Sequence, residues 1–189
     1  MKPLKALFAF CLLHFALVVG LSAQSPAAYD TSELVNTAHQ LNAQDLPRLQ
    51  ARAESGEGRA QVLLGLAYEM GGAGLRPQPP MALSWFLKAA DQGITWAQVW
   101  AADFYLSGSD GIARDVSKAL MLYRSAADHG DPKAAFSVGQ IYFYGDGVTA
   151  DHQEAAAWYR RARASDVPVV ERMLALTATP CESNFEASS

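Results

Sequence analysis

The residues in this sequence that could most readily bind a metal ion are its histidines and the acids of its loops. His39, His129 and His152 lie far apart, with none of the short spacings typical of a zinc site. Asp146 and Asp151 share one glycine-bearing stretch, but two acids are too few for a calcium loop. The sequence therefore predicts no metal site.

Nucleophilic and phosphate chemistry also lack their usual patterns. The Gly-Gly-Ala-Gly run at 71–74 does not end in the Lys-Ser/Thr pair of a phosphate loop. There is no serine elbow, and neither Cys11 nor Cys181 forms a cysteine–histidine pair that the chain order would bring together. We therefore expect no catalytic residue, no cofactor and no enzymatic activity.

The first 23 residues have the features of a signal peptide. Lys2 and Lys5 precede an apolar run over 6–21, and small residues follow up to Ala23. The run is shorter than the roughly 20 residues of a membrane-spanning helix and contains His14, which argues against the alternative of a retained anchor. We expect cleavage near Ala23, a periplasmic or secreted protein, and no stable membrane insertion afterwards.

The overall charge limits the class of partner. The full chain has a formal net charge of −4, and loss of the two N-terminal lysines would bring it to −6. An acidic protein is poorly suited to nucleic acid or to an anionic membrane surface. With Cys11 removed, the mature chain would have only Cys181 and thus no internal disulfide. We expect the partner to be another protein or a peptide segment, and not nucleic acid.

Seven columns of residues repeat in phase along the chain, with a period of 37 and a one-residue deletion in the third loop. The columns are Gly56/Gly93/Gly130, Ala60/Ala97/Ala134, Tyr68/Tyr105/Tyr142, Gly71/Gly108/Gly145, Ala82/Ala119/Ala155, Phe86/Tyr123/Tyr159 and Ala89/Ala126/Ala162. Agreement across so many columns predicts a tandem-repeat protein.

Each unit has the pattern of two helices joined by a glycine-bearing loop. Ala119, Leu120, Tyr123 and Ala126 recur at three- and four-residue intervals, which places them on one helical face. Small residues allow paired helices to approach closely, and aromatic residues fill the space between pairs. Asp131 is the expected N-cap at a unit boundary, followed by proline in the first turn.

The predicted organisation has seven segments. They are a signal peptide (1–23), an N-terminal capping helix pair (24–55), repeat 1 (56–93), repeat 2 (94–130), repeat 3 (131–166), a C-terminal capping helix (167–178) and a disordered tail (179–189). Caps are needed because the end repeats of a stack would otherwise expose their apolar faces.

The third unit, with Tyr-Phe-Tyr-Gly-Asp-Gly-Val at 142–148 and Trp-Tyr-Arg-Arg-Ala at 158–162, resembles the Sel-one-like repeat (SLR) family. This family is a relative of the tetratricopeptide repeat with a longer loop between its helices. The resemblance covers 56–166 and departs at Gln78, where the other units have aspartate, and at Arg163 and Asp166.

The resemblance implies an all-α fold, a right-handed α/α superhelix (solenoid), and a role as an adaptor for other proteins. It implies no catalytic residues. Some cysteine-rich bacterial members have been linked to β-lactam binding or hydrolysis, but they have a cysteine pair in each repeat. This chain has none, so that activity is not expected here.

In a stack of helix pairs the first helices line the inner surface, which is the usual binding face. The candidate partner-binding groove comprises Arg59, Val62, Leu66, Glu69, Trp96, Val99, Asp103, Leu106, Lys133, Phe136, Gln140 and Phe143. Trp96 is distinctive because its column otherwise holds cations. It is either exposed for binding or covered by a neighbouring segment. We expect Trp85, Trp100 and Trp158 to be packing residues.

Three hypotheses follow for function. The first is an exported scaffold that mediates protein–protein interaction through its concave groove. The second is a small periplasmic hydrolase or cell-wall ligand-binding protein that uses the same groove, which would require two convergent titratable groups with perturbed pKa values. The third is a structural repeat that self-associates through its last helix.

Overall fold

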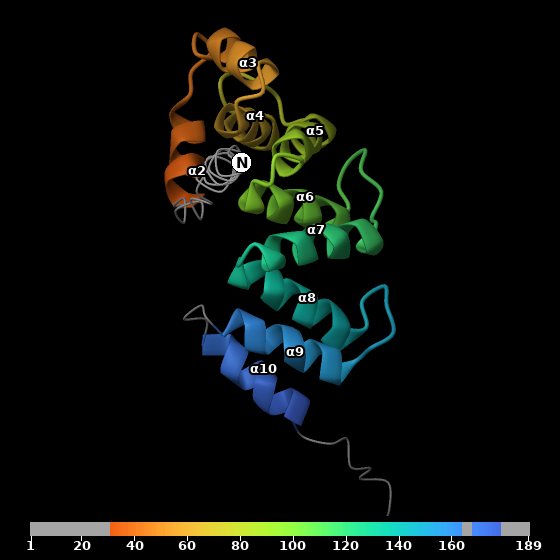
Figure 1. Ribbon diagram of the computed structural model, residues 1–189. Helices are drawn as coiled ribbons and strands as arrows, with labels where there is room; N and C mark the ends of the chain where they lie inside the picture. Colours follow the sequence, from red (N-terminus) through yellow and green to blue (C-terminus); the bar gives the residue numbers. More distant parts are fainter. Residues whose placement is uncertain (1–30, 164–167, 179–189) are drawn as a thin grey trace, which may run out of the picture. The chain divides into compact units, whose positions relative to one another are not determined.

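The computed structural model describes residues 31–163 and 168–178, and within these ranges the regular structure is helical (Figure 1). The helices are α2 (Thr31–Gln40), α3 (Leu46–Glu54), α4 (Gly58–Met70), α5 (Pro79–Ala90), α6 (Thr95–Ser107), α7 (Val116–Asp128), α8 (Pro132–Tyr144), α9 (His152–Ala162) and α10 (Pro168–Ala178). The predicted signal peptide and the predicted disordered tail lie outside the described residues. No described helix has both the length and the apolar character needed to cross a membrane.

Contacts divide the chain into two compact units, residues 1–34 and 35–189. Within the first unit only the start of α2 is described. In the second unit, helices α3 to α10 each pack mainly against their neighbours in sequence. Helices α4, α6 and α8 are the first helices of the three repeats, and α5, α7 and α9 are the second helices. The expected helix-pair repeat is confirmed.

The three inter-helix loops close with the same hydrogen bond. The backbone N–H that precedes each second helix donates to the carbonyl of the repeated tyrosine: Gln78 to Tyr68 (2.7 Å), Asp115 to Tyr105 (2.8 Å) and Asp151 to Tyr142 (2.9 Å). The N-cap side chains differ. Those of Asp115 and Asp151 accept hydrogen bonds from the first turn of α7 and α9, whereas Gln78 makes no cap bond. The departure of the first loop in sequence is therefore also a structural departure.

Within each pair, an aromatic residue of the second helix packs against a small residue of the first. A Cβ atom added to Gly65 would lie 2.6 Å from Cε1 of Phe86, and one added to Gly139 would lie 2.6 Å from Cδ1 of Tyr159. Both aromatic residues are fully buried. The predicted close approach through small residues is confirmed, because these glycines let the helices approach to ring-contact distance. The aromatic rings were predicted to lie between pairs, and Phe86 packs both within its pair and against Trp100 and Phe104 of the next.

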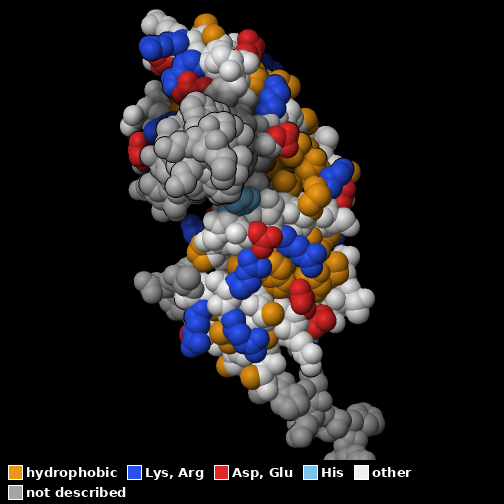
Figure 2. Space-filling view, in the orientation of Figure 1, with side chains coloured by type: hydrophobic (Ala, Val, Ile, Leu, Met, Phe, Trp, Pro, Cys, Tyr) orange, Lys and Arg blue, Asp and Glu red, His pale blue; other side chains and the backbone are white. Residues whose placement is uncertain are grey.

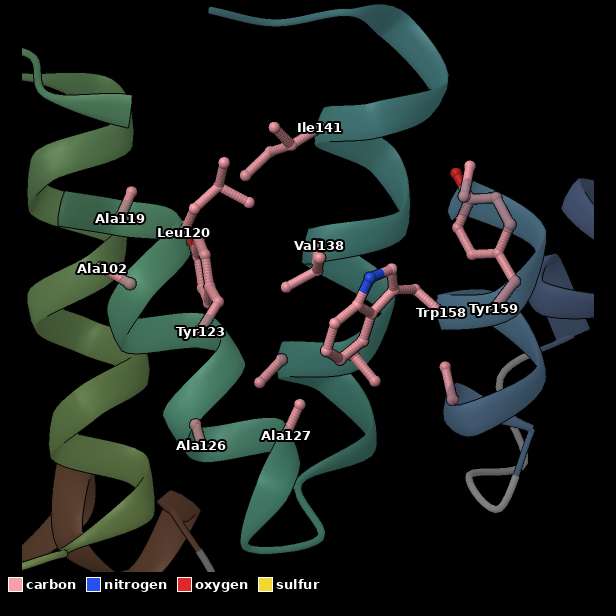
Figure 3. Packing of buried hydrophobic residues seen from close by; sticks show 14 of the residues in the cluster. Ala102, Ala119, Leu120, Tyr123, Ala126, Ala127, Val138, Ile141, Trp158 and Tyr159 are labelled. Atoms are coloured by element: carbon pink, nitrogen blue, oxygen red, sulfur yellow. The ribbon is translucent and has the colours of Figure 1, made fainter. Parts of the chain in front are cut away.

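Between pairs, the core is built from aliphatic and aromatic side chains. Figure 3 shows Tyr123 and Leu120 of α7 facing Val138 and Ile141 of α8, while Trp158 extends from α9 toward α8. This cluster continues into α10 through Val170 and Met173. Helix α10 thus packs against the core through these two side chains.

Two buried glutamines tie successive pairs together. Nε2 of Gln61 donates to the carbonyl of Ala53 at the end of α3 (3.1 Å), and Nε2 of Gln98 donates to that of Ala90 at the end of α5 (3.4 Å). Both amides thereby add a donor to a carbonyl at a helix C-terminus that also accepts a hydrogen bond from the backbone N–H of the following glycine, Gly56 or Gly93. Sequence analysis did not identify this contact.

Candidate partner-binding site

The twelve predicted groove residues differ widely in exposure. Arg59, Glu69, Asp103 and Lys133 are exposed by surface area, although neighbouring atoms partly desolvate the carboxyl groups of Glu69 and Asp103. Six others, on α6 and α8, are half-buried: Trp96, Val99, Leu106, Phe136, Gln140 and Phe143. We call the predicted residues of α6 and α8, together with Glu69 of α4, the first-helix face.

Val62 and Leu66 require a correction. The sequence placed them on the binding surface, but they are 0% and 2% exposed. The physical reason is the composition of α4, which has apolar side chains on all sides, and a helix of that kind is buried all round. These two residues belong to the interior, and only the ends of their helix contribute exposed charged groups.

Trp96 is the outer member of an aromatic series that leads into the core. Its ring meets Trp100 edge-to-face at a centroid distance of 5.4 Å, and Trp100 in turn lies 5.3 Å from the buried ring of Phe86. Trp100 therefore packs against the core, as expected. The Trp96 ring is therefore supported on one side by the ring of Trp100.

Two carboxylates with perturbed pKa values lie on the same face. Asp103 accepts a hydrogen bond from the hydroxyl of Tyr123, which favours its ionised form, but burial has the larger effect and raises its pKa. Burial also raises the pKa of Glu69, and the negative charge of Asp103 raises it further. The charge of Asp103 on α6 thus acts on the carboxyl group of Glu69 on α4.

The α8 part of the face is aromatic instead. Phe136 and Phe143 pack against Tyr159, with ring centroids 5.5 and 6.4 Å apart. Phe143 also contacts Tyr144 at 5.0 Å and His152 at 4.8 Å. Tyr144 is 68% exposed and was not among the predicted residues. The site therefore changes from acidic near α4 and α6 to aromatic on α8.

Helix α10 continues the same columns one step further. Its start repeats that of α8, so Val169, Arg172 and Leu176 hold the positions of Lys133, Phe136 and Gln140. Val169 and Leu176 are 39% and 47% exposed, which is unusual for large apolar side chains. The alignment of the two helix starts was visible in the sequence and would have added these residues to the prediction.

Metal and cofactor sites find no support in the described residues. No three of their histidine, cysteine, aspartate and glutamate side chains are grouped so that they could hold a metal ion. Nδ1 of His129 lies 2.7 Å from the carbonyl oxygen of Ser125, so this residue caps the end of α7. His152 stacks on Phe143 instead of joining a ligand set.

Comparison with known proteins gives a consistent result. Three segments, residues 58–94, 97–131 and 132–166, match the family described as Sel1 repeat, and together they make up more than half of the chain. Among curated proteins, chitin synthase regulatory factor 3 of Schizosaccharomyces pombe is 35% identical over 120 residues, which are 63% of this chain and 13% of that protein. An ERAD-associated E3 ubiquitin-protein ligase component of Arabidopsis thaliana is 32% identical over 112 residues, 59% of this chain and 17% of that protein. The chain thus spans less than a fifth of the length of either relative.

Solved structures show the same fold. A Sel1 repeat protein from Oxalobacter formigenes has a TM-score of 0.66 and 30% identity, covering 76% of this chain and 58% of the other. A protective antigen with an SLR fold from uropathogenic Escherichia coli has a TM-score of 0.59 and 36% identity, covering 63% and 25%. The cysteine-rich protein B of Helicobacter pylori has a TM-score of 0.52, covering 69% and 92%, but at 16% identity it supports the fold alone.

Proposed function

This chain belongs to the Sel1-repeat family, and on that premise we propose that it is an exported scaffold that binds a segment of another protein through its first-helix face. Proteins built from Sel1 repeats mediate protein–protein interaction, and the relatives found here are named as a regulatory factor and a ligase component. The export part of the proposal rests on the charged, apolar and small-residue regions of residues 1–23.

One observation carries the proposal. On α6 and α8, none of the eight predicted face residues is buried: six are half-buried, and Asp103 and Lys133 are exposed. The interior of a helical repeat protein is densely packed, so side chains that belong to it are buried. A row of aromatic and aliphatic side chains that stays partly exposed is therefore surface that a partner would cover. A mixture of such side chains with charges is typical of a protein-binding surface.

Binding should depend most strongly on Trp96. We expect Trp96→Ala to weaken partner binding by about 2 kcal/mol, roughly thirtyfold, as truncation of a tryptophan hot spot does. The measurement is affinity capture from an envelope extract with the purified protein, followed by titration of each captured protein against both versions. Met81→Ala on α5, which removes a side chain that is 40% exposed and outside the face, is the matched control.

Two results would contradict this assignment. Equal recovery of the same proteins by the wild type and by Trp96→Ala would remove the face as the binding site, provided that both variants show the same thermal unfolding. A retained N-terminus on protein recovered from cells, read by N-terminal sequencing, would contradict cleavage near Ala23.

A second candidate function is a small hydrolase or a cell-wall ligand-binding protein. It is favoured by the raised pKa values of Glu69 and Asp103, because hydrolases often keep one carboxyl protonated as a general acid beside an ionised one. The test is hydrolysis of purified cell-wall fragments. Turnover that disappears in both Glu69→Gln and Asp103→Asn would replace the scaffold proposal with this one.

A further inference from the structure

Two of the first helices, α4 and α8, have charged residues that oppose the helix dipole. A helix has partial positive charge at its N-terminus and partial negative charge at its C-terminus, so acids stabilise the first turn and bases the last. In α4 the order is reversed, with Arg59 as the second residue and Glu69 as the last but one. In α8, Lys133 is the second residue. The stability of these helices therefore does not explain why these charges are present.

The second helix α9 follows the usual rule. Glu154 lies in its first turn, and Arg160 and Arg161 lie in its last. Arg161 also pairs with Asp128 of α7, to which its Nη2 donates at 2.7 Å. Figure 2 shows basic and acidic side chains next to one another over α7 to α9. The charges on this side of the repeats are thus matched within the chain itself.

Along the first helices, by contrast, the two signs of charge are separated. Arg59 and Lys133 lie in first turns, whereas Glu69 and Asp103 lie in the C-terminal halves of α4 and α6. First helices of consecutive repeats point in the same direction, because each repeat returns the chain to the same side of the stack. At the usual helical rise, roughly 15 Å separates the level of Arg59 from that of Glu69. The first helices therefore have a basic edge at their N-termini and an acidic edge formed by Glu69 and Asp103.

The acidic edge is not neutralised by the described part of the chain. No described lysine, arginine or histidine forms an ion pair with Glu69 or Asp103. Asp103 accepts a hydrogen bond from the hydroxyl of Tyr123, which is neutral. Burial raises the pKa of Glu69 and the charge of Asp103 raises it further, so both carboxylates would attract a cation placed near them.

Apolar side chains flank this acidic edge on α6. Val99 lies four residues before Asp103 and Leu106 three residues after it, so all three share one side of the helix. Val99 and Leu106 are half-buried. A ligand at this edge therefore meets a negative charge with hydrocarbon surface on either side. Lysine and arginine match that combination, because each has a long aliphatic stem that ends in a cation.

On the premise that the first-helix face binds a protein segment, we propose that this segment has a lysine or arginine that pairs with Glu69 and Asp103, next to an apolar side chain that packs on Val99 and Leu106. The basic edge at Lys133 repels a second cation there. The segment therefore binds in one direction, with its basic end toward the C-termini of α4 and α6.

The test is selection of short random peptides from a display library on the purified protein, followed by titration of synthetic copies of the enriched peptides. We expect enrichment of Lys or Arg beside an aliphatic or aromatic residue. Glu69→Gln and Asp103→Asn should each weaken binding of these peptides about tenfold. High salt should weaken binding by the wild type and have less effect on the double variant, which no longer has the two charges.

A charge reversal tests the pairing directly. Glu69→Lys, at an exposed position, should no longer select basic peptides and should favour peptides with Asp or Glu in place of the basic residue. Asp91→Asn is the matched control, because it removes one negative charge from the exposed C-cap of α5, outside the first-helix face. It should bind the basic peptides as the wild type does. Thermal unfolding checks that each variant folds.

The outcomes separate this inference from the proposed function. Enrichment without a basic residue overturns it, as does equal binding of the peptides by the wild type, Glu69→Gln and Asp103→Asn. If Trp96→Ala alone loses the peptides, the face remains a binding site with a different chemistry. If Trp96→Ala and the acid variants all bind as the wild type does, the proposed site fails as well. Self-association seen by sedimentation and lost in Glu69→Lys would make a second copy the occupant.

Discussion

Two regions of each repeat differ in how far their residues are repeated. Residue types recur at the contact between the two helices of a pair, whereas they vary on the first-helix face. At the pair contact, the three repeats use nearly the same residues: Phe86 and Tyr159 meet Gly65 and Gly139, and the second repeat has Tyr123 and Ala102 in the same columns. On the face, the corresponding column of Trp96 has arginine in one repeat and lysine in another. The shared positions specify how helices pack, and the varied positions give each repeat its own surface chemistry. Substitutions at the two regions should therefore affect different measurements.

The largest expected effect is at the pair contact of the first repeat. Phe86 is fully buried and lies 5.3 and 6.0 Å from the rings of Trp100 and Phe104. Phe86→Ala should lower the free energy of unfolding by about 3–5 kcal/mol, because it leaves a cavity between two helix pairs. Urea denaturation measures this. Met81→Ala, on the exposed side of the same helix, should change it by less than about 0.5 kcal/mol, and comparable losses in the two variants would refute the distinction.

The next effect tests the close approach of α8 and α9. Gly139→Ala puts a methyl group 2.6 Å from the Tyr159 ring and should cost about 1–3 kcal/mol of stability. The second repeat has Ala102 at this position, so its helices already accommodate the methyl group. Gln140→Ala, on the neighbouring face position, is the control in the same denaturation experiment. A loss of stability no greater than that of Gln140→Ala would show that α8 and α9 can move apart at little cost in free energy.

A smaller effect concerns the loops that join the pairs. Asp151 accepts hydrogen bonds from the N–H groups of Gln153 and Glu154, so Asp151→Ala should cost about 1 kcal/mol. Gln78 has almost the same backbone angles but no cap bond. Gln78→Asp should therefore stabilise the first loop by up to about 1 kcal/mol through the N–H of Met81, since Pro79 and Pro80 have none. Thermal unfolding of both variants decides whether the loops are equivalent, and a loss of stability in Gln78→Asp would show that they are not.

The smallest stability effect lies on the face and depends on pH. Because burial raises the pKa of Asp103, its carboxyl binds a proton more tightly in the folded than in the unfolded state. The contribution of the protonated Asp103 carboxyl to folding stability is thus fully present at low pH. It is lost as the pH rises through the pKa of Asp103 in the folded state. Asp103→Asn should gain stability relative to the wild type as the pH rises above about 4. In the same variant the pKa of Glu69, followed by NMR titration, should fall because the neighbouring charge is gone.

The control for this titration is Ser109→Ala, at an exposed loop position, which changes no titratable side chain. An unchanged pKa of Glu69 in Asp103→Asn would show that the two carboxylates do not interact. That result would also remove the main support for a hydrolase, while binding through Trp96 would remain open to test.

Much of the fold could be predicted because it depends on local patterns. The period of the tyrosine and glycine columns predicted the helix pairs, and Asp131 was predicted as an N-cap, which its hydrogen bond to the N–H of Ala134 confirms. The predicted packing of Trp85 and Trp158 is also confirmed, at 7% and 8% exposure. These features follow from backbone geometry and residue size, which recur in every repeat.

The site could be predicted only in part, because exposure depends on residues distant in sequence. The repeat register predicted Val62 and Leu66 as groove residues, but both are buried. It predicted the same for Val99 and Asp103, and these two are not buried. Register also gave no sign that the Asp103 carboxylate accepts a hydrogen bond from the hydroxyl of Tyr123, which lies twenty residues further along the chain. Periodicity identifies the side of a helix, but not what packs against it.

The sequence by itself determined the repeat, its helix pairs, its capping residues and the side of each first helix that has varied chemistry. Those properties need only the spacing of residues along one helix or loop. Tertiary structure alone decided that α4 is buried and that the charge of Asp103 raises the pKa of Glu69. These depend on distances between helices, and such distances arise only when the pairs stack.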